Sequence, residues 1–204
     1  MRVLPLLAAF GLPLLAAFGL AACAMVDGTP PAVALPPEPI PVATAPELLA
    51  RRLPAEAASF RRGATTPVRQ PSPGVEVAYA TNGRTAAGFV QVLRPPGEDA
   101  LPDGIESAAA QAEYQRSIAE AVRGAGQHRR LRVIAEVNHP ENNPLFHCAE
   151  MEGTYGRQAV QSMTCVGGAG GQLLRIRVSM PQHEPALADP RAFLRDITAA
   201  LRAP

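Results

Sequence analysis

Four strand-like segments follow one another in the C-terminal half of the chain, at residues 131–137, 145–152, 158–166 and 173–180. Turn residues separate them, and the links are too short for the crossover connections that parallel strands require. The last segment alternates most clearly, because apolar Leu174 and Ile176 flank the charged Arg175. These segments therefore predict an antiparallel sheet.

A hairpin further upstream would add two strands to this sheet. Residues 74–81 and 87–93 have strand character and lie on either side of Asn82-Gly83. This dipeptide is a strong hairpin signal, because both residues tolerate the positive φ of a tight turn. A tight hairpin is therefore predicted over residues 74–93.

Two helices are expected to pack on the sheet. The first is predicted from Asp103, which forms a capping-box-like start with Glu106, to about Arg123, where glycines follow. The second is predicted to begin with Asp189 as its N-cap and Pro190 at its first helical position. The predicted apolar faces consist of Tyr114, Ile118, Ala121 and Val122 in the first helix and of Phe193, Ile197, Ala200 and Leu201 in the second.

The element order β-β-α-β-β-β-β-α predicts an α+β domain over residues 74–204, with a mostly antiparallel sheet of about six strands and packed helices. This order resembles the Mog1/PsbP-like α+β folds, in which an antiparallel sheet lies between helices and which recur in small envelope lipoproteins. The resemblance implies an arrangement of elements and no activity, because a fold does not determine a function.

The segment before this domain, residues 23–73, is expected to be a tether. The prolines within residues 24–46 are Pro30, Pro31, Pro36, Pro37, Pro39, Pro41 and Pro46. Such a composition is typical of an extended semi-rigid spacer, which at about 3.1 Å per residue would reach roughly 70 Å. A proline-motif ligand for another protein is the alternative. Short helical turns broken at Pro54 and a second connector over residues 61–73 complete the predicted tether.

The first residues of the chain form an uncharged apolar run from Val3 to Val26, after a single basic residue at Arg2. A membrane-spanning helix is one interpretation of such a run. Prolines and glycines interrupt it, however, and no basic flank follows until Arg51. A cleaved signal peptide over residues 1–22 is therefore favoured.

The sequence Leu20-Ala21-Ala22-Cys23 resembles the lipobox of bacterial lipoproteins, which is an aliphatic residue, two small residues and a cysteine. The resemblance implies cleavage between Ala22 and Cys23, a thioether-linked diacylglycerol on Cys23, and acylation of the new N-terminus by a chain such as palmitate. Ala24, in place of aspartate, implies the inner leaflet of the outer membrane, as in lipoproteins similar to those of enteric bacteria. The alternative is that Cys23 is only a small apolar residue of a signal or anchor helix.

The other two cysteines, Cys148 and Cys165, lie on consecutive strand segments. A two-residue turn at Gly156-Arg157, with glycine where positive φ is needed, places them directly opposite each other. An even pair of cysteines in an oxidising compartment favours a disulfide, which would stabilise the domain by roughly 3 kcal/mol. Two buried free thiols are the alternative.

Soft metal ligands are a rival interpretation of the same region, where His139, His147, Cys148, Met151, Met163, Met180 and His183 occur. No close pairing orients two of them together, and adjacent strand residues face opposite sides, so no metal or other cofactor is assigned. No catalytic residue is assigned either, because the sequence has no GxSxG elbow, no Walker loop and no HExxH motif, and the glycines of residues 167–171 lack the spacing of a dinucleotide fingerprint. Glu150 and Glu152 share a strand face, for which a solvated surface is the simpler explanation.

The charge does not point to a nucleic acid. The formal net charge is +1, and removal of residues 1–22 would leave 18 of the 19 basic residues against 18 acidic ones. A basic strip would form only if the strands that carry Arg130, Arg132, Arg175 and Arg177 were neighbours, and no stacking aromatic residues lie between them. Cross-strand pairs of arginine and glutamate are the expected alternative.

These features predict a lipid-anchored envelope protein whose domain faces the periplasm as a non-enzymatic binding or structural accessory module. Its expected partners are membrane lipid, through the acylated Cys23, and an unidentified envelope protein. A lipoprotein that delivers a small solute to a membrane complex is the alternative, and it requires a pocket with converging polar groups. An envelope hydrolase would instead require a perturbed acid or nucleophile in a cleft.

Overall fold

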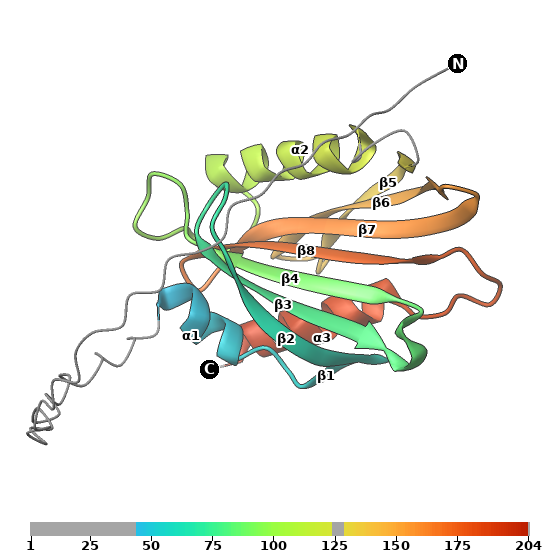
Figure 1. Cartoon of the computed structure of the whole chain (residues 1–204). Helices are drawn as coiled ribbons and strands as arrows, with labels where there is room; N and C mark the ends of the chain where they lie inside the picture. The colour runs from blue at the N-terminus through green and yellow to red at the C-terminus, as the bar shows by residue number, and fades with distance from the viewer. Residues whose placement is uncertain (1–43, 124–128, 204) are drawn as a thin grey trace, which may run out of the picture. The chain divides into compact units, whose positions relative to one another are not determined.

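A computed structural model of the chain describes residues 44–123 and 129–203. The predicted signal peptide, Ala22, Cys23 and most of the proline-rich spacer lie outside the described residues, as do the glycines expected to end the first helix. The described residues form three α-helices and eight strands (Figure 1). The α+β class predicted from the sequence is confirmed.

The strands form one antiparallel sheet in the order β1-β2-β3-β4-β8-β7-β6-β5, so that β1 and β5 are its edges. They are β1 (Glu56–Ala57), β2 (Phe60–Val68), β3 (Gly74–Thr81), β4 (Ala87–Leu93), β5 (Arg129–His139), β6 (Phe146–Tyr155), β7 (Gln158–Ala169) and β8 (Gln172–Pro181). The prediction of about six strands is therefore wrong, because the sheet has eight. The additional β1 and β2 arise within the segment predicted to be a tether.

Strand β2 has little of the sequence character of a buried strand. Phe60 at its start is fully buried, but most residues after it are exposed, and Gly63 and Pro67 interrupt any apolar alternation. A bulge between Arg62 and Thr65 also shifts its register with β3. Strands near the edge of a sheet need not be buried on both faces, so the usual apolar pattern is absent.

Helix α1 (Ala45–Arg51) belongs to the same compact unit as the sheet. The Glu47 carboxylate accepts a hydrogen bond from the backbone N–H of Thr44 at 2.6 Å and so caps the first turn. Leu49 and Leu53 are buried in the main core. The helical turns predicted before Pro54 are thus present, but they are part of the core and not of a tether.

The helices divide between the two faces of the sheet, with α1 and α3 (Pro190–Arg202) on one side and α2 (Ala108–Arg123) on the other (Figure 1). The main core lies under α1 and α3, where the ring of Phe193 packs 4.8 Å from that of Phe60 and 5.2 Å from that of Tyr79. Helix α2 packs over β5 and β7 through a smaller cluster around Tyr114. The α2 side of the sheet is therefore only partly covered.

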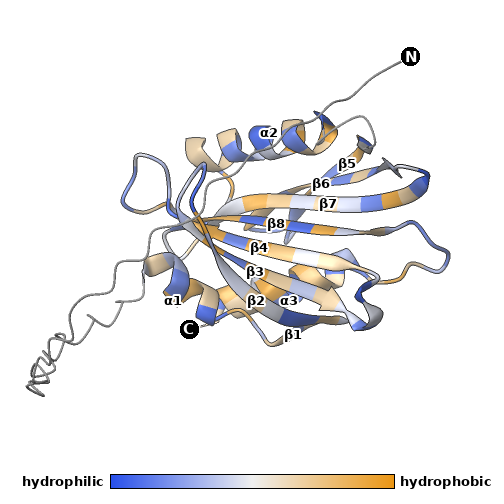
Figure 2. Ribbon diagram, in the orientation of Figure 1, coloured by the Kyte–Doolittle hydropathy of each residue, from blue (hydrophilic) through white to orange (hydrophobic). Residues whose placement is uncertain are grey.

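The predicted alternation of β8 is confirmed. Leu174, Ile176 and Val178 are buried in the main core, while Arg175 and Arg177 face the α2 side and are partly exposed. Figure 2 shows hydrophobic and polar residues interspersed along the central strands β7 and β8. Alternation of this kind is what allows one sheet to pack a core on one face and to carry polar groups on the other.

The two predicted helix starts have different outcomes. Asp189 caps α3 as predicted, because its carboxylate accepts hydrogen bonds from the backbone N–H groups of residues 191 and 192 at 2.8 and 3.1 Å. The predicted start of α2 at Asp103 is wrong, because the helix begins at Ala108 and the Ser107 hydroxyl accepts from the N–H of Ala110. Asp103 instead accepts from the N–H of Gly170, which holds it at the β7–β8 turn.

The hairpin of β3 and β4 is confirmed with the predicted bounds, but its turn is longer than expected. A short 3₁₀ turn over Asn82–Arg84 and the residues after it connect the strands, with Gly83 at φ 74°. The two-residue turn predicted at Gly156-Arg157 is confirmed, because Tyr155 pairs with Gln158 and Gly156 has φ 60°. This second turn fixes the register of β6 and β7.

Tyr79 is expected to make the domain less stable at alkaline pH. Its hydroxyl donates to the carbonyl oxygen of Pro54 at 2.8 Å, and burial raises its pKa to about 12 although Arg62 opposes the shift. Because this pKa exceeds the ordinary value of 10.0, the unfolded chain loses the proton first as the pH rises. We expect the free energy of unfolding in urea to fall between about pH 10 and about pH 12, and Tyr79→Phe to remove this part of the loss. Equal pH profiles for the two proteins would contradict the assignment.

Candidate functional site

A cleft of about 690 Å³ lies where α2 meets the partly covered face of the sheet. The sheet contributes Glu76, Phe89, Gln91, Thr164, Arg175 and Arg177 to its lining. Helix α2 contributes Arg116, Ser117, Glu120, Ala121 and Arg123. Its size falls within the range of about 300–1,000 Å³ that is typical of small-molecule sites.

Strand register brings the sheet residues of the cleft together. Gln91 on β4 pairs with Glu76 on β3 and with Arg175 on β8, so these three side chains form a row across adjacent strands. Phe89 pairs in the same way with Arg177, whose guanidinium carbon lies 5.3 Å from the centre of the Phe89 ring. Directly paired residues of neighbouring strands face the same side of a sheet, here the α2 side.

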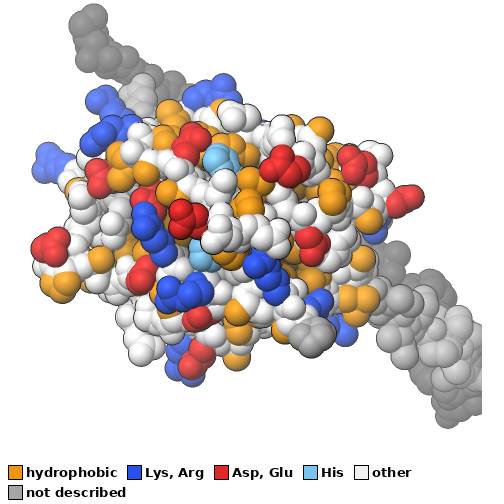
Figure 3. All heavy atoms as spheres, turned by 180° about the vertical axis from the view of Figure 1, so that it is seen from behind, with side chains coloured by type: hydrophobic (Ala, Val, Ile, Leu, Met, Phe, Trp, Pro, Cys, Tyr) orange, Lys and Arg blue, Asp and Glu red, His pale blue; other side chains and the backbone are white. Residues whose placement is uncertain are grey.

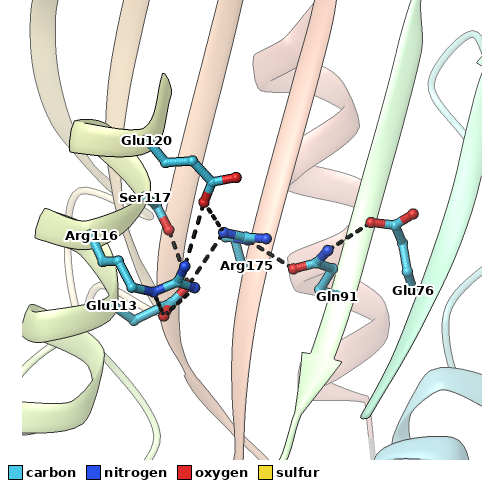
Figure 4. A network of polar contacts seen from close by, with 7 residues as sticks. All are labelled: Glu76, Gln91, Glu113, Arg116, Ser117, Glu120 and Arg175. Atoms are coloured by element: carbon cyan, nitrogen blue, oxygen red, sulfur yellow. Dashed lines mark hydrogen bonds and ion pairs between the residues drawn. The ribbon is translucent and has the colours of Figure 1, made fainter. Parts of the chain in front are cut away.

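Arg175 is the centre of the polar network (Figure 4). Its Nε donates to Oε1 of Gln91 at 2.8 Å, and the Nε2 of Gln91 donates to Oε2 of Glu76 at 2.7 Å. Its Nη1 donates to Oε2 of Glu120 at 3.0 Å and lies 3.6 Å from Oε1 of Glu113. The network therefore connects α2 with strands that it does not cover.

The α2 side of the network is built on Glu113, which is only 7% exposed. Arg116 forms a bidentate pair with its carboxylate, at 2.6 Å from Nη2 to Oε1 and 2.9 Å from Nε to Oε2. The Ser117 hydroxyl donates to Oε1 of Glu113 at 3.1 Å. These contacts satisfy a carboxylate whose burial would otherwise be costly.

Thr164 on β7 lines the cleft and is 2% exposed, and its hydroxyl has no hydrogen-bond partner among the described residues. It pairs across the strands with Arg177. A buried hydroxyl without a partner costs free energy, so such groups in folded proteins call for an explanation. Thr164 is therefore the residue of the cleft whose buried hydroxyl has no structural role in the part of the fold that the structure describes.

A second cavity, of about 620 Å³, lies at the other end of α2 beside Tyr114 and His147. The Nδ1 of His147 lies 2.6 Å from Oδ1 of Asn138, and its Nε2 lies 3.3 Å from Oε2 of Glu136. Burial, together with the charge of Glu136, raises the pKa of the Tyr114 hydroxyl. The lining of this second cavity contains fewer charged side chains than that of the first cleft. Its His147 contacts Asn138 and Glu136 of the neighbouring strand β5 through the hydrogen bonds described above.

The predicted disulfide is confirmed. Cys148 and Cys165 are directly paired on β6 and β7 and are bonded, and both are fully buried. They belong to the main core, on the face opposite to the cleft. Their place in the core makes the disulfide part of the scaffold that carries Thr164, the residue before Cys165.

The basic strip considered from the sequence does not form. Arg130 and Arg132 lie on the edge strand β5, which β6 and β7 separate from β8 with Arg175 and Arg177. Arg132 instead lies 3.6 Å from Glu152, its directly paired neighbour on β6, so the expected cross-strand pair is present there.

Glu150 and the candidate metal ligands do not make a site. Glu150 pairs with Arg191 at the start of α3, with 2.6 Å between Oε1 and Nη2. Burial and the charges of Arg195 and Arg202 lower the pKa of His139, and these cations would also repel a metal ion. Within residues 44–123 and 129–203, no three His, Cys, Asp or Glu side chains are arranged to hold a metal ion.

Most residues of the cleft are not predictable from the sequence. The charged residues Glu113, Arg116 and Glu120 lie at helical i, i+3 and i+7 positions, which is also the pattern of a solvated helix face. Thr164 carries no signal in the sequence, because any strand can hold a threonine. Only the position of α2 on the sheet shows that these residues meet Arg175.

Comparison of the chain with protein-family models, with curated proteins and with solved structures finds no match. No helix in the described part of the chain has both the length and the apolar character needed to cross a membrane. The function is therefore inferred from the residues and geometry of the chain itself.

Proposed function

We propose that this chain is a lipid-anchored lipoprotein of the cell envelope whose α+β domain faces the periplasm as a non-enzymatic binding or accessory module. The observation that carries the proposal is the sequence Leu20-Ala21-Ala22-Cys23, with its complete lipobox pattern. The disulfide between Cys148 and Cys165 supports it, because such bonds persist in oxidising compartments outside the cytoplasm.

Membrane lipid is the first proposed partner, through acyl chains on Cys23. Each buried methylene group contributes about 0.8 kcal/mol, so several chains would hold the protein in a bilayer essentially permanently. The residue after the cysteine, Ala24, favours the inner leaflet of the outer membrane. The proline-rich residues 24–46 would then act as a spacer between the lipid and the domain.

The anchor can be tested by changing its attachment atom. We expect Cys23→Ser to abolish incorporation of labelled palmitate and to move the protein from the membrane to the soluble fraction of lysed cells. Globomycin, which blocks lipoprotein signal cleavage, should make the unprocessed form of the original protein accumulate. The matched control is the double variant Cys148→Ser/Cys165→Ser, which should still be labelled. A Cys23→Ser protein that remains with the membranes would refute the proposed anchor.

A binding role is supported by the uncovered part of the sheet. Helix α2 packs over β5 and β7, so Glu76, Ala78 and Phe89 on the same side of β3 and β4 remain partly exposed. A face left open beside a helix offers side chains of several kinds to a partner. An envelope protein is the proposed second partner, and crosslinking in intact cells from a photoreactive residue at position 78 should capture it. Absence of any adduct at that position, with adducts elsewhere, would exclude this face.

A solute-binding lipoprotein is the second candidate function, favoured by the cleft of about 690 Å³ with its converging polar groups. No nucleic acid is proposed as a partner, because a nucleic-acid backbone needs a continuous positive surface. On the face shown in Figure 3, basic and acidic side chains are instead interspersed. We assign no catalytic residue and no cofactor.

A further inference from the structure

We propose that the cleft beside α2 binds a small anion, namely the carboxylate or phosphate group of a small molecule, between the hydroxyl of Thr164 and the surrounding arginines. This inference rests on the proposed binding role and names the chemistry of its ligand. Carboxylate and phosphate groups offer the same recognition chemistry, a negatively charged group of oxygen acceptors.

The charges of the lining favour an anion over a cation. Four arginines and two glutamates line the cleft, and a third glutamate, Glu113, contacts both Arg116 and Arg175, which leaves one positive charge in excess. Arg116 and Arg175 are paired with the glutamates of α2. Arg123 ends α2 and has no ion pair within the part of the chain that the structure describes. Guanidinium groups are the side chains best suited to bind carboxylate and phosphate.

The buried hydroxyl of Thr164 is a second feature of the cleft that favours an anion. Thr164 lines the sheet side of the cleft, and its buried hydroxyl has no partner among the described residues, although a hydroxyl can donate one hydrogen bond and accept two. Its cross-strand neighbour Arg177 faces the same side, and Arg175 lies two residues before Arg177 on β8. Because the Thr164 oxygen is fully buried, an anionic oxygen would accept its hydrogen bond by displacing the side chains that cover it, within reach of these guanidinium groups.

The shape of the cleft leaves room for the rest of the ligand. Phe89, whose ring also contacts Arg177, contributes an apolar side chain from the sheet, and Ala121 contributes a small side chain from α2. A neutral polyol would use the hydrogen-bonding groups but not the positive charge of Arg123. An anion with a small organic body uses both.

The test is isothermal titration calorimetry on the full chain in detergent micelles, in a chloride buffer of low ionic strength. The probes are inorganic phosphate and citrate, and maltose is the neutral control. We expect saturable binding of phosphate, citrate or both, no binding of maltose, and weaker binding at higher salt. Phosphate alone or citrate alone would identify which anion the site prefers.

Two variants assign the binding to the cleft. Thr164→Val keeps the shape of the side chain but removes the hydroxyl, and we expect it to weaken anion binding about tenfold, since a hydrogen bond to a charged group is lost. Arg123→Ala should weaken it several-fold, whereas Arg157→Ala, at the exposed β6–β7 turn, should leave it unchanged. Thr164→Val should also unfold at the same temperature as the original protein or higher, because a buried hydroxyl without a partner is removed.

Three results would overturn the inference: no saturable binding of either anion, binding of maltose alone, or equal affinities for the original protein and for both Thr164→Val and Arg123→Ala. Failure of the proposed anchor would be seen separately. Cys23→Ser changes acylation and fractionation but should leave the calorimetric affinity unaltered, so each proposal can fail without the other.

Discussion

Replacement of Phe193 by alanine is expected to lower the free energy of unfolding by about 3–5 kcal/mol. The side chain is fully buried at the centre of the main core, and its ring contacts those of Phe60 and Tyr79. It also lies over Gly88, where a Cβ atom would be only 3.1 Å from its Cζ, so β4 leaves room for this ring. Its loss would open a cavity between α3 and several strands. Urea unfolding followed by circular dichroism measures the effect.

Phe89→Ala is the matched control. Phe89 follows Gly88 on β4, but its side chain faces the cleft on the other side of the sheet and is partly exposed. Its truncation should cost about 1 kcal/mol or less, because little buried apolar surface is lost. Similar losses for Phe89→Ala and Phe193→Ala would contradict the assignment of the main core to the α3 face.

The double variant Cys148→Ala/Cys165→Ala is expected to be less stable than the original protein by roughly 3 kcal/mol. The disulfide joins residues 17 positions apart, and its loss frees the unfolded chain from a closed loop. Both side chains are fully buried, so alanine leaves no unpaired polar group. Thermal unfolding under oxidising conditions measures the difference.

A reductant distinguishes the disulfide from simple packing. Complete reduction before the measurement should lower the stability of the original protein and leave that of Cys148→Ala/Cys165→Ala unchanged. If the reductant has no effect on the original protein, or an equal effect on both, the stability does not depend on the bond. Because Thr164 precedes Cys165 on β7, the anion affinity of the double variant also reports whether the bond keeps the cleft in place.

Strong local patterns made most of the fold predictable from the sequence. The alternation of β8 and the glycine of the Gly156-Arg157 turn each reflect a local requirement, and the turn fixed the pairing of Cys148 with Cys165. β2 could not be predicted, because an exposed strand with glycine and proline has no such pattern. The start of α2 was misplaced because Asp103 has a tertiary partner, the N–H of Gly170, which competes with a local cap.

The candidate site was less predictable than the fold. The sequence shows that Arg175 and Arg177 share one face of β8, but it does not show which helix approaches that face. The network depends on that approach, since Arg175 contacts Glu120 across 55 residues of chain and Gln91 across 84. Long-range arrangements of this kind leave no periodic signal.

The two edges of the sheet determine how another chain can recognise this domain. Strand β1 is only two residues long, and β5 carries a bulge between Val133 and Ala135. Strand β1 pairs only with Phe60 and Arg61, so the rest of β2 is also an edge, and its bulge and Pro67 hinder the addition of a further strand as the bulge of β5 does. The pairing of a further strand through backbone hydrogen bonds, which depends little on side-chain identity, is thus disfavoured at both edges of the sheet. A protein partner would then be recognised through side chains on the faces of the sheet, so its binding would be sensitive to single substitutions.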